Sequence, residues 1–226
     1  MSFIEPRKLE VLSRPFFIVT EGMADAYFVD ELLKHKAITK CSVGCPSKDS
    51  AGGMGKPAFG KYLLGMQTAR ARKTSVNLQG LLVIADADEN PAKSFKDVTD
   101  ALDNAQFPKP TDPFQVQDIN GFRSAVYLIP AQGETGTLEH LLLRATFLKS
   151  QGLEQCLAQF SECTGGLKST DANSNAKMRM SVLAGAFCKG NPWCSAGLMW
   201  KDEGNPVPID SKAFDALSAF IVQFSD

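Results

Sequence analysis

The sequence lacks the features that mark several specialised classes of protein. It contains no run of about 18 apolar residues, the length that indicates a membrane-spanning helix. Residues 1–14 are charged and poor in apolar side chains, unlike a secretory signal. We therefore expect a cytoplasmic globular protein that has no membrane partner.

Cysteine and histidine are too sparse and too widely spaced to indicate a zinc site. The six cysteines lack the C-x2-C spacing typical of zinc-binding segments, and the chain has only two histidines, His35 and His140. A disulfide framework is not expected in a chain of 226 residues with ordinary composition. We predict free, buried thiols in a reducing cytosol.

An excess of charge of either sign is also missing. The formal net charge is −1 at pH 7, so the protein is not a bulk polycation. It would contact nucleic acid only through a local basic patch or through bound metal. This balance opposes tight, constitutive binding to duplex DNA but suits an enzyme that visits nucleic acid transiently. Such an enzyme would act alone or as the effector of a protein partner.

Short apolar runs predict four buried strands in the first 130 residues. The runs cover residues 16–19, 39–43, 81–84 and 125–129. Between them, apolar residues recur at helical spacing over residues 24–36, 59–72 and 92–104. Continuous apolar strands that alternate with helices indicate a parallel sheet covered on both faces. We expect an α/β, Rossmann-like fold with a mostly parallel four-stranded sheet.

The pattern after residue 130 is helical. Helices are predicted over residues 137–149, 152–163, 175–187 and 212–224. We expect residues 14–150 to form the α/β core. Residues 151–226 would then be a helical extension packed on it, in the same domain or as a small subdomain.

Acidic residues follow two of the predicted strands. Glu21 comes directly after the first strand, and Asp86 and Asp88 follow the third. The carboxyl ends of neighbouring parallel strands share one edge of a sheet, so these acids should meet there. In an extended strand end, Asp86 and Asp88 would face the same side. Their mutual repulsion calls for a hard cation with oxygen ligands, Mg²⁺ or Mn²⁺.

The acids also have an ordinary structural explanation. Asp88 alone fits a helix N-cap, because Asn90 and Pro91 follow it closely. Three acids placed after two strongly apolar strands favour metal binding over capping. Gly22 is expected to allow a tight turn after Glu21 and to leave room for a phosphate.

Two segments resemble the motifs of Toprim domains, the metal-binding module of topoisomerases, primases and related nucleases. Residues 16–22 resemble the glutamate motif, and residues 82–88 resemble the Asp-x-Asp motif. Asp25 matches the acid that often follows the glutamate motif. The resemblance covers roughly residues 14–130. It is closest to small stand-alone Toprim-like proteins and more distant to the overcoming-lysogenization-defect nucleases.

The resemblance implies roles for these residues. Glu21 would be a metal ligand or the general acid/base, and Asp86 and Asp88 would hold Mg²⁺ or Mn²⁺. Asp25 and Gly22 would lie on the substrate side of the site. No tyrosine has the context of a strand-transfer nucleophile, and no primase-type zinc segment is present, so hydrolysis is favoured over topoisomerase chemistry.

Three further residues are candidates for the site. Glu139 would complete a second metal position, or it would be a first-turn acid favoured by the helix dipole after an N-cap at Thr137. Lys177 would bind phosphate or be an exposed helical lysine. Lys56 ends a Gly-rich stretch, residues 50–57, that departs from the phosphate-loop pattern at both ends. With a basic cluster at Lys61, Arg70, Arg72 and Lys73, it would contact a phosphate backbone, or the cluster would be an ordinary solvated face.

Three functions are compatible with these residues. The first is Mg²⁺-dependent hydrolysis of phosphodiesters in nucleic acid. The second is a non-catalytic module of the same fold that binds or regulates a partner. The third is a phosphohydrolase of the haloacid dehalogenase type, which also begins from Asp-x-Asp after a strand but would leave Glu21 without a role.

Overall fold

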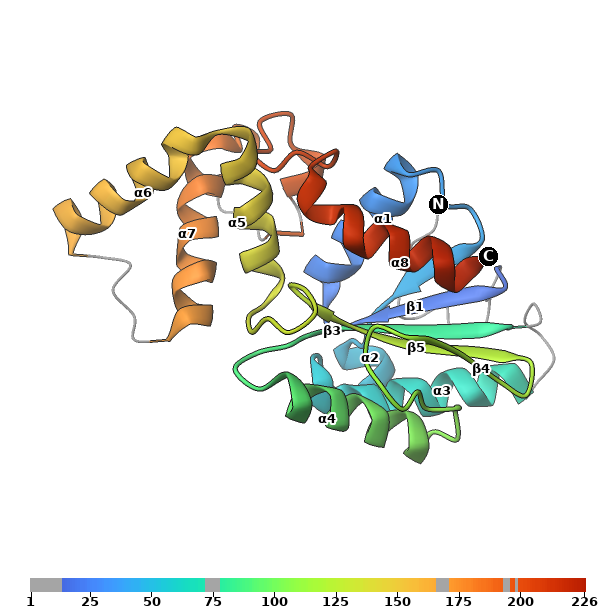
Figure 1. Ribbon diagram of the computed structural model, residues 1–226. Coiled ribbons are helices and arrows are strands. Elements are labelled where there is room, and N and C mark those ends of the chain that lie inside the picture. The colour runs from blue at the N-terminus through green and yellow to red at the C-terminus, as the bar shows by residue number, and fades with distance from the viewer. Residues whose placement is uncertain (1–13, 72–77, 166–170, 193–195, 198) are drawn as a thin grey trace.

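Five strands form the centre of the protein. The computed structural model describes residues 14–71, 78–165, 171–192, 196–197 and 199–226. The strands are β1 (Phe16–Thr20), β2 (Cys41–Gly44), β3 (Gly80–Asp86), β4 (Val116–Ile119) and β5 (Phe122–Ile129). Their order in the sheet is β2-β1-β3-β5-β4, in which β2, β1, β3 and β5 are parallel and β4 is antiparallel to β5 (Figure 1).

The apolar strands bury both of their faces. In β1, Phe16 and Ile18 point into one hydrophobic cluster, and Phe17 and Val19 point into another. Alternating side chains of a strand face opposite sides, so a sheet covered on both sides needs a continuous apolar run. The prediction of a parallel sheet between two helical layers is therefore confirmed.

Helices cover the two faces of the sheet (Figure 1). On one face lie α2 (Lys48–Ala51), the 3-10 turn η2 (Lys56–Ala58), α3 (Phe59–Ala71) and α4 (Pro91–Asn104). On the other face lie α1 (Met23–His35) and α8 (Asp215–Ser225), and the same hydrophobic cluster continues into α5 (Leu138–Lys149) and α7 (Ala172–Phe187), which pack against each other beside the sheet. The remaining elements are α6 (Gln151–Thr164) and the 3-10 turns η3 (Met199–Lys201) and η4 (Lys212–Phe214).

Two neighbouring strands lead the chain in opposite directions across the sheet. After β1 the chain passes through α1 to β2, and after β3 it passes through α4 and β4 to β5 on the other side. The register pairs Thr20 of β1 with Ile84 of β3, so both strands end at nearly the same level. In doubly wound sheets, ligands bind at this point of divergence, outside the carboxyl ends of the strands.

The sheet has five strands, and the expectation of four is wrong. The additional strand, β4, is an edge strand of four residues whose side chains are only partly buried. It therefore lacks the apolar run that revealed the other strands. Asn120 and Gly121 connect it to β5 with φ angles of 55° and 77°. Asn-Gly at such angles is typical of a two-residue hairpin turn, and this dipeptide could have indicated the additional strand from the sequence.

The helical second half shares its hydrophobic core with the sheet. Leu157 of α6, Met180 of α7 and Phe224 of α8 belong to the same buried cluster as Ile18 of β1. Phe224 is fully buried and packs edge-on against Phe16, with 5.3 Å between the ring centroids. The C-terminal helix thus closes one face of the sheet.

Five of the cysteines lie in the described residues, and the expectation that the thiols are buried is wrong for two of them. Cys41, Cys45 and Cys188 are buried, whereas Cys156 and Cys163 are exposed on α6. Cys194 lies outside the described residues. Within the described part of the chain, no helix is long and apolar enough to span a bilayer.

The packing of α8 gives a stability prediction. Replacing Phe224 with alanine should lower the free energy of unfolding by about 3–5 kcal/mol, because it leaves a cavity against the sheet. Val222→Ala is the matched control, since Val222 is exposed on the same helix. It should change stability by less than about 0.5 kcal/mol in urea denaturation. Equal effects of the two substitutions would show that α8 does not close the core.

Candidate functional site

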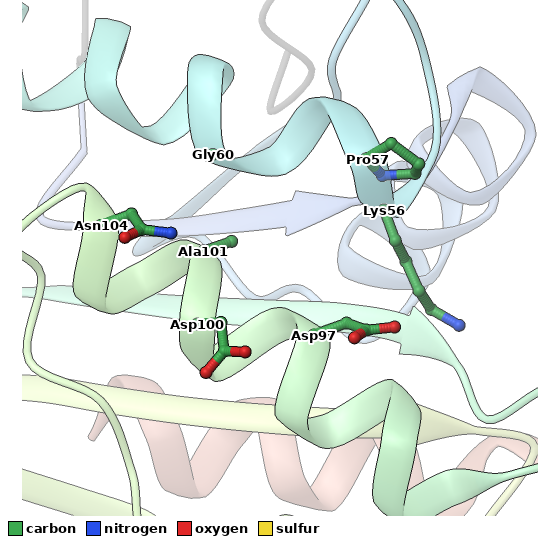
Figure 2. A pocket seen from close by; sticks show the side chains of 7 residues that line it. All are labelled: Lys56, Pro57, Gly60, Asp97, Asp100, Ala101 and Asn104. Atoms are coloured by element: carbon green, nitrogen blue, oxygen red, sulfur yellow. The ribbon is translucent and has the colours of Figure 1, made fainter.

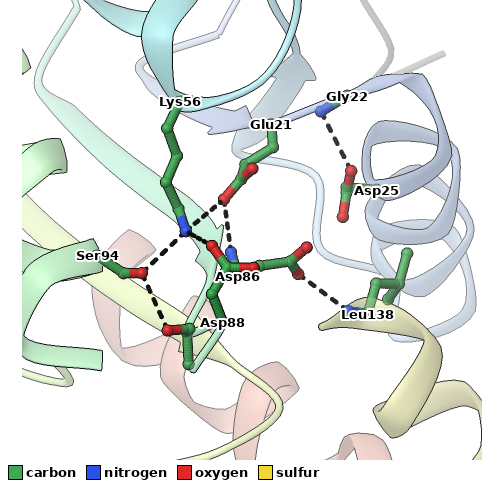
Figure 3. A network of polar contacts seen from close by, with 9 residues as sticks. Glu21, Gly22, Asp25, Lys56, Asp86, Asp88, Ser94 and Leu138 are labelled. Atoms are coloured by element: carbon green, nitrogen blue, oxygen red, sulfur yellow. Dashed lines mark hydrogen bonds and ion pairs between the residues drawn. The ribbon is translucent and has the colours of Figure 1, made fainter. Parts of the chain in front are cut away.

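The ends of β1 and β3 are joined through an acidic side chain. Glu21 follows β1, and its Oε1 accepts a hydrogen bond of 2.8 Å from the backbone N–H of Asp86, the last residue of β3 (Figure 3). The fixed register between the two strands makes this contact geometrically accessible. The structure therefore brings Glu21 and Asp86 together at one edge of the sheet.

The side chain of Asp86 points toward the beginning of α5. Its Oδ1 accepts a 2.9 Å hydrogen bond from the backbone N–H of Leu138, the first residue of that helix. The first N–H groups of a helix lack partners within the helix and carry partial positive charge. Asp86 thus fixes the N-terminus of α5 beside the acidic edge of the sheet.

Asp88 does not continue β3 as an extended residue. Its backbone has a left-handed φ of 51° and exchanges two hydrogen bonds with Gly136, of 2.8 and 2.7 Å. Aspartate tolerates this conformation better than most residues. The expectation that Asp86 and Asp88 face the same side of an extended strand end is therefore wrong. The turn directs Asp88 toward Lys56 and leaves Asp86 directed toward α5.

Lys56 reaches the acids from the loop before α3. Its Nζ lies 2.5 Å from Asp88 Oδ2 and 3.4 Å from Glu21 Oε1, and it donates a 2.9 Å hydrogen bond to Ser94 Oγ (Figure 3). Ser94 in turn donates to the carbonyl oxygen of Ala87 at 3.0 Å. One ammonium group therefore contacts two of the three acids predicted from the strand ends.

Two other acids complete the cluster. Asp25 lies in the first turn of α1, where its Oδ2 accepts a 3.1 Å hydrogen bond from the N–H of Gly22. Glu139 lies in the first turn of α5 and accepts a 2.7 Å hydrogen bond from the hydroxyl of Thr137. The first-turn position predicted for Glu139 is thus confirmed. Its negative charge also acts on Asp25 and Asp86, so it lies beside the cluster.

Gly22 does not make the tight turn expected of it. Its φ of −150° and ψ of 178° describe extended backbone, which any residue adopts. The N–H of Gly22 is used within the chain, as a donor to Asp25. That Gly22 leaves room for a substrate phosphate, because it has no side chain, stays a prediction.

Crowding of the acids changes their pKa values. Burial raises the pKa of Asp86 well above its usual range, and the charges of Asp25, Glu21 and Glu139 raise it further. Burial and the charges of Glu21 and Glu139 likewise raise the pKa of Asp25 to about 7. Burial also raises the pKa of Glu21, against the opposing attraction of Lys56. Full ionisation of the clustered carboxylates is therefore unfavourable.

Lys56 shows the complementary behaviour. Burial alone would lower its pKa, but the charge of Glu21 and the hydrogen bond to Asp88 outweigh burial and raise the pKa. The lysine is therefore held as a cation. Where side chains are described, no three His, Cys, Asp or Glu residues have their ligand atoms gathered around one metal-sized position.

Two cavities of about 330 Å³ adjoin the cluster and share Lys56 and Asp97 in their walls. One lies between α3 and α4, where the Lys56 side chain extends toward Asp97 (Figure 2) and Asp100 also lines the wall. The other lies at the beginning of α4 and is lined by Asp88, Lys93, Ser94 and Asn173, among others. The second cavity therefore connects the acids to the beginning of α7, which contains Asn173.

Lys177 lies outside the contacts of the acidic cluster. It is exposed on α7, four residues beyond Asn173 and hence on the same helix face. Its role in phosphate binding stays a prediction. Of the basic cluster, Arg70 is engaged in a cation–π contact with Phe122, whereas residues 72 and 73 lie outside the described residues.

Sequence reasoning missed the partners that fix the acids. Ser94 lies in the first turns of α4, and the N–H of Leu138 belongs to the start of α5; neither carries a motif. The sequence singled out Lys56 for a substrate phosphate but gave no sign that its ammonium contacts Glu21 and Asp88. That contact depends on how the loop after β2 folds over the ends of the neighbouring strands.

Together, the fold and the site define a doubly wound α/β protein with an acidic cluster at the carboxyl ends of its central strands. Residues 15–193 match the family described as "Protein of unknown function (DUF3226)". This match spans most of the chain, from β1 to α7, so the protein belongs to that family. No curated protein and no solved structure matches the chain.

The raised pKa of Asp25 predicts how stability depends on pH. Folded Asp25 keeps its proton up to about pH 7, whereas an unfolded aspartate loses it near 3.8. Proton binding by folded Asp25 therefore stabilises the fold fully at low pH, and this contribution to the unfolding free energy is lost as the pH rises toward 7. Without divalent ions, the unfolding free energy should fall between about pH 5 and about pH 7.5.

Asp25→Asn should make this slope shallower, because an amide does not titrate, and the remaining slope comes from Asp86 and Glu21, whose pKa values are also raised. The measurement is urea denaturation with EDTA at both pH values. Asp103→Asn is the control, since Asp103 is exposed on α4 and pairs with Lys109 at 3.0 Å. A slope that survives Asp25→Asn unchanged would contradict the assignment.

Proposed function

We propose that the acidic cluster is a divalent-metal site of Toprim type that hydrolyses phosphodiesters in nucleic acid. The observation that carries the proposal is the meeting of Glu21 and Asp86 at the ends of two adjacent parallel strands. The order and the positions of these acids are those of the two motifs recognised in the sequence. Their place, where the chain diverges after β1 and β3, is the usual ligand-binding position of such a sheet.

The side chains at the site fit a hard divalent cation in their chemistry. The candidate ligands are Glu21, Asp86, Asp88 and Glu139, all of which offer carboxylate oxygens. Burial and mutual repulsion raise the pKa of Asp86, and a cation would relieve that repulsion. When bound, Mg²⁺ or Mn²⁺ would supply polarisation of the phosphoryl oxygens and an acidified water.

The remaining residues would position the substrate and move protons. Glu21 has a raised pKa, which suits a general acid/base that exchanges a proton at its carboxylate. Lys56 and the beginning of α4 line the cavity beside Asp88, where a phosphate group would meet positive charge. Lys177 and Asn173 lie on one face of α7, so Lys177 would contact the substrate farther from the acids.

A second function, a non-catalytic binding or regulatory module, is favoured by one observation. Lys56 already supplies a positive charge to Glu21 and Asp88, so the cluster is partly neutralised by the chain itself. No comparable observation favours a phosphohydrolase of the haloacid dehalogenase type. In that reading Glu21 has no role, whereas its side chain here joins the two strand ends.

Hydrolysis is tested by incubating the purified protein with Mg²⁺ or Mn²⁺ and with supercoiled DNA, linear DNA, single strands or RNA. We expect metal-dependent cleavage of at least one polymer. Asp86→Asn should lower its rate by about 100-fold or more, as the loss of a preorganised charged group does in other active sites. Asp118→Asn, at an exposed residue of the distant strand β4, should cleave at the wild-type rate.

Two results would contradict hydrolysis. Cleavage that is equal in wild type and Asp86→Asn would place the activity elsewhere or in a contaminant. Absence of cleavage together with retained binding of a nucleic acid would leave the binding module as the function.

A further inference from the structure

Lys56 is an unusual lysine because its charged end is turned into the protein. Only 12% of its side chain is exposed, although lysine is among the residues least often buried without a partner. The ammonium contacts Asp88, Glu21 and Ser94, which come from three different segments of the chain. A partly buried charge that is paired with two carboxylates and a hydroxyl is held in a defined environment, unlike an exposed lysine on the surface.

The loop that carries Lys56 is fixed to the same strand end as Glu21. The N–H of Gly55 donates a 3.0 Å hydrogen bond to the backbone carbonyl oxygen of Glu21. Gly52 and Gly55 have φ angles of 72° and 78°, which glycine adopts far more readily than other residues. The backbone therefore presents Lys56 to the acids at a defined position.

The contacts of Lys56 overlap with the proposed metal ligands. Glu21 Oε1 and Asp88 Oδ2 lie against the ammonium, and a divalent cation held by these two carboxylates would lie close to it. Two cations cannot share these oxygens closely without repulsion between their like charges. The Lys56 ammonium thus already supplies the positive charge that a bound metal would supply to Glu21 and Asp88.

The cavity between α3 and α4 offers Lys56 another place to go. Asp97 lines that cavity from α4, and the Lys56 side chain extends toward it (Figure 2), whereas Asp100 in the same wall is paired with Lys96 at 2.5 Å. A four-carbon side chain with rotatable bonds can turn from Glu21 and Asp88 toward Asp97 without backbone movement. Gly60, also in the wall, leaves this space open, since a Cβ there would meet no atom within 4 Å.

We propose that Lys56 is the resident counter-ion of the acidic cluster and that a divalent cation binds by exchange with it. The ammonium leaves Glu21 and Asp88 and moves into the cavity lined by Asp97. There it faces the cavity at the beginning of α4, where the phosphate of a substrate would lie. The inference rests on the proposed function, because it concerns the same acids.

Titration calorimetry with Mn²⁺ alone tests the exchange. Lys56→Gln keeps a polar partner for Ser94 but removes the competing charge, so it should bind Mn²⁺ about tenfold more tightly than wild type. Lys56→Arg, which keeps the charge, should bind no more tightly than wild type. Lys109→Gln is the matched control: it removes a lysine that pairs with Asp103 at 3.0 Å and contacts none of the clustered acids, so it should leave the affinity unchanged.

A second readout follows Lys56 itself. Acetic anhydride acetylates exposed amines, and mass spectrometry of the digested protein reports the extent at each lysine. Acetylation of Lys56 in wild type should become faster when Mn²⁺ is added, because its ammonium is released from Glu21 and Asp88. Lys61, which is exposed on α3, serves as the internal reference and should not change.

The outcomes separate this inference from the proposed function. If wild type binds Mn²⁺ but Lys56→Gln binds it equally or more weakly, the exchange is wrong and the metal site stands. If only Lys56→Gln binds Mn²⁺, the Lys56 ammonium does compete with Mn²⁺ for the carboxylates. Metal-dependent hydrolysis by the natural chain is then contradicted. If neither binds, both are wrong. Unchanged acetylation of Lys56 in Mn²⁺-bound wild type would also overturn the exchange.

Discussion

Repulsion among carboxylates at the ends of β1 and β3 is the constraint on which the site depends. The parallel register brings Glu21 to Asp86, and the helices that begin nearby add Asp25 and Glu139. Backbone N–H groups offset part of the repulsion, one from Asp86 itself and one from Leu138. The remaining charge is met by Lys56. Each of these partners comes from a different element, so the cluster also links the β1, β3 and α5 segments.

Much of the fold could be predicted because its signals are local. The apolar runs of β1 and β3 reveal strands buried on both faces, and helical spacing locates α1, α3 and α4 to within a residue or so. The edge strand β4 was not predicted because its residues, such as the half-buried Gln117 and the exposed Asp118, do not form an apolar run. Its turn at Asn120 was readable, since Asn-Gly favours the hairpin that the structure contains.

The site was predictable where it depends on strand ends and not where it depends on loops. Glu21 and Asp86 follow apolar strands, so topology alone places them side by side. The left-handed backbone of Asp88 and its pairing with Gly136 are set by the loop before α5, which is distant in sequence. The ion pairs of Lys56 likewise arise from the folding of a Gly-rich loop over the strand ends. Local sequence patterns do not encode such contacts.

The central claim is that these carboxylates hold a divalent cation. It is tested most directly by a crystal structure of the protein grown with Mn²⁺, with anomalous diffraction used to locate the ion. The account predicts an anomalous peak about 2.0–2.3 Å from a carboxylate oxygen of Asp86 and from one of Glu21 or Asp88. An anomalous map without a peak at these acids, with the Lys56 ammonium still on Asp88 and Glu21, would contradict it.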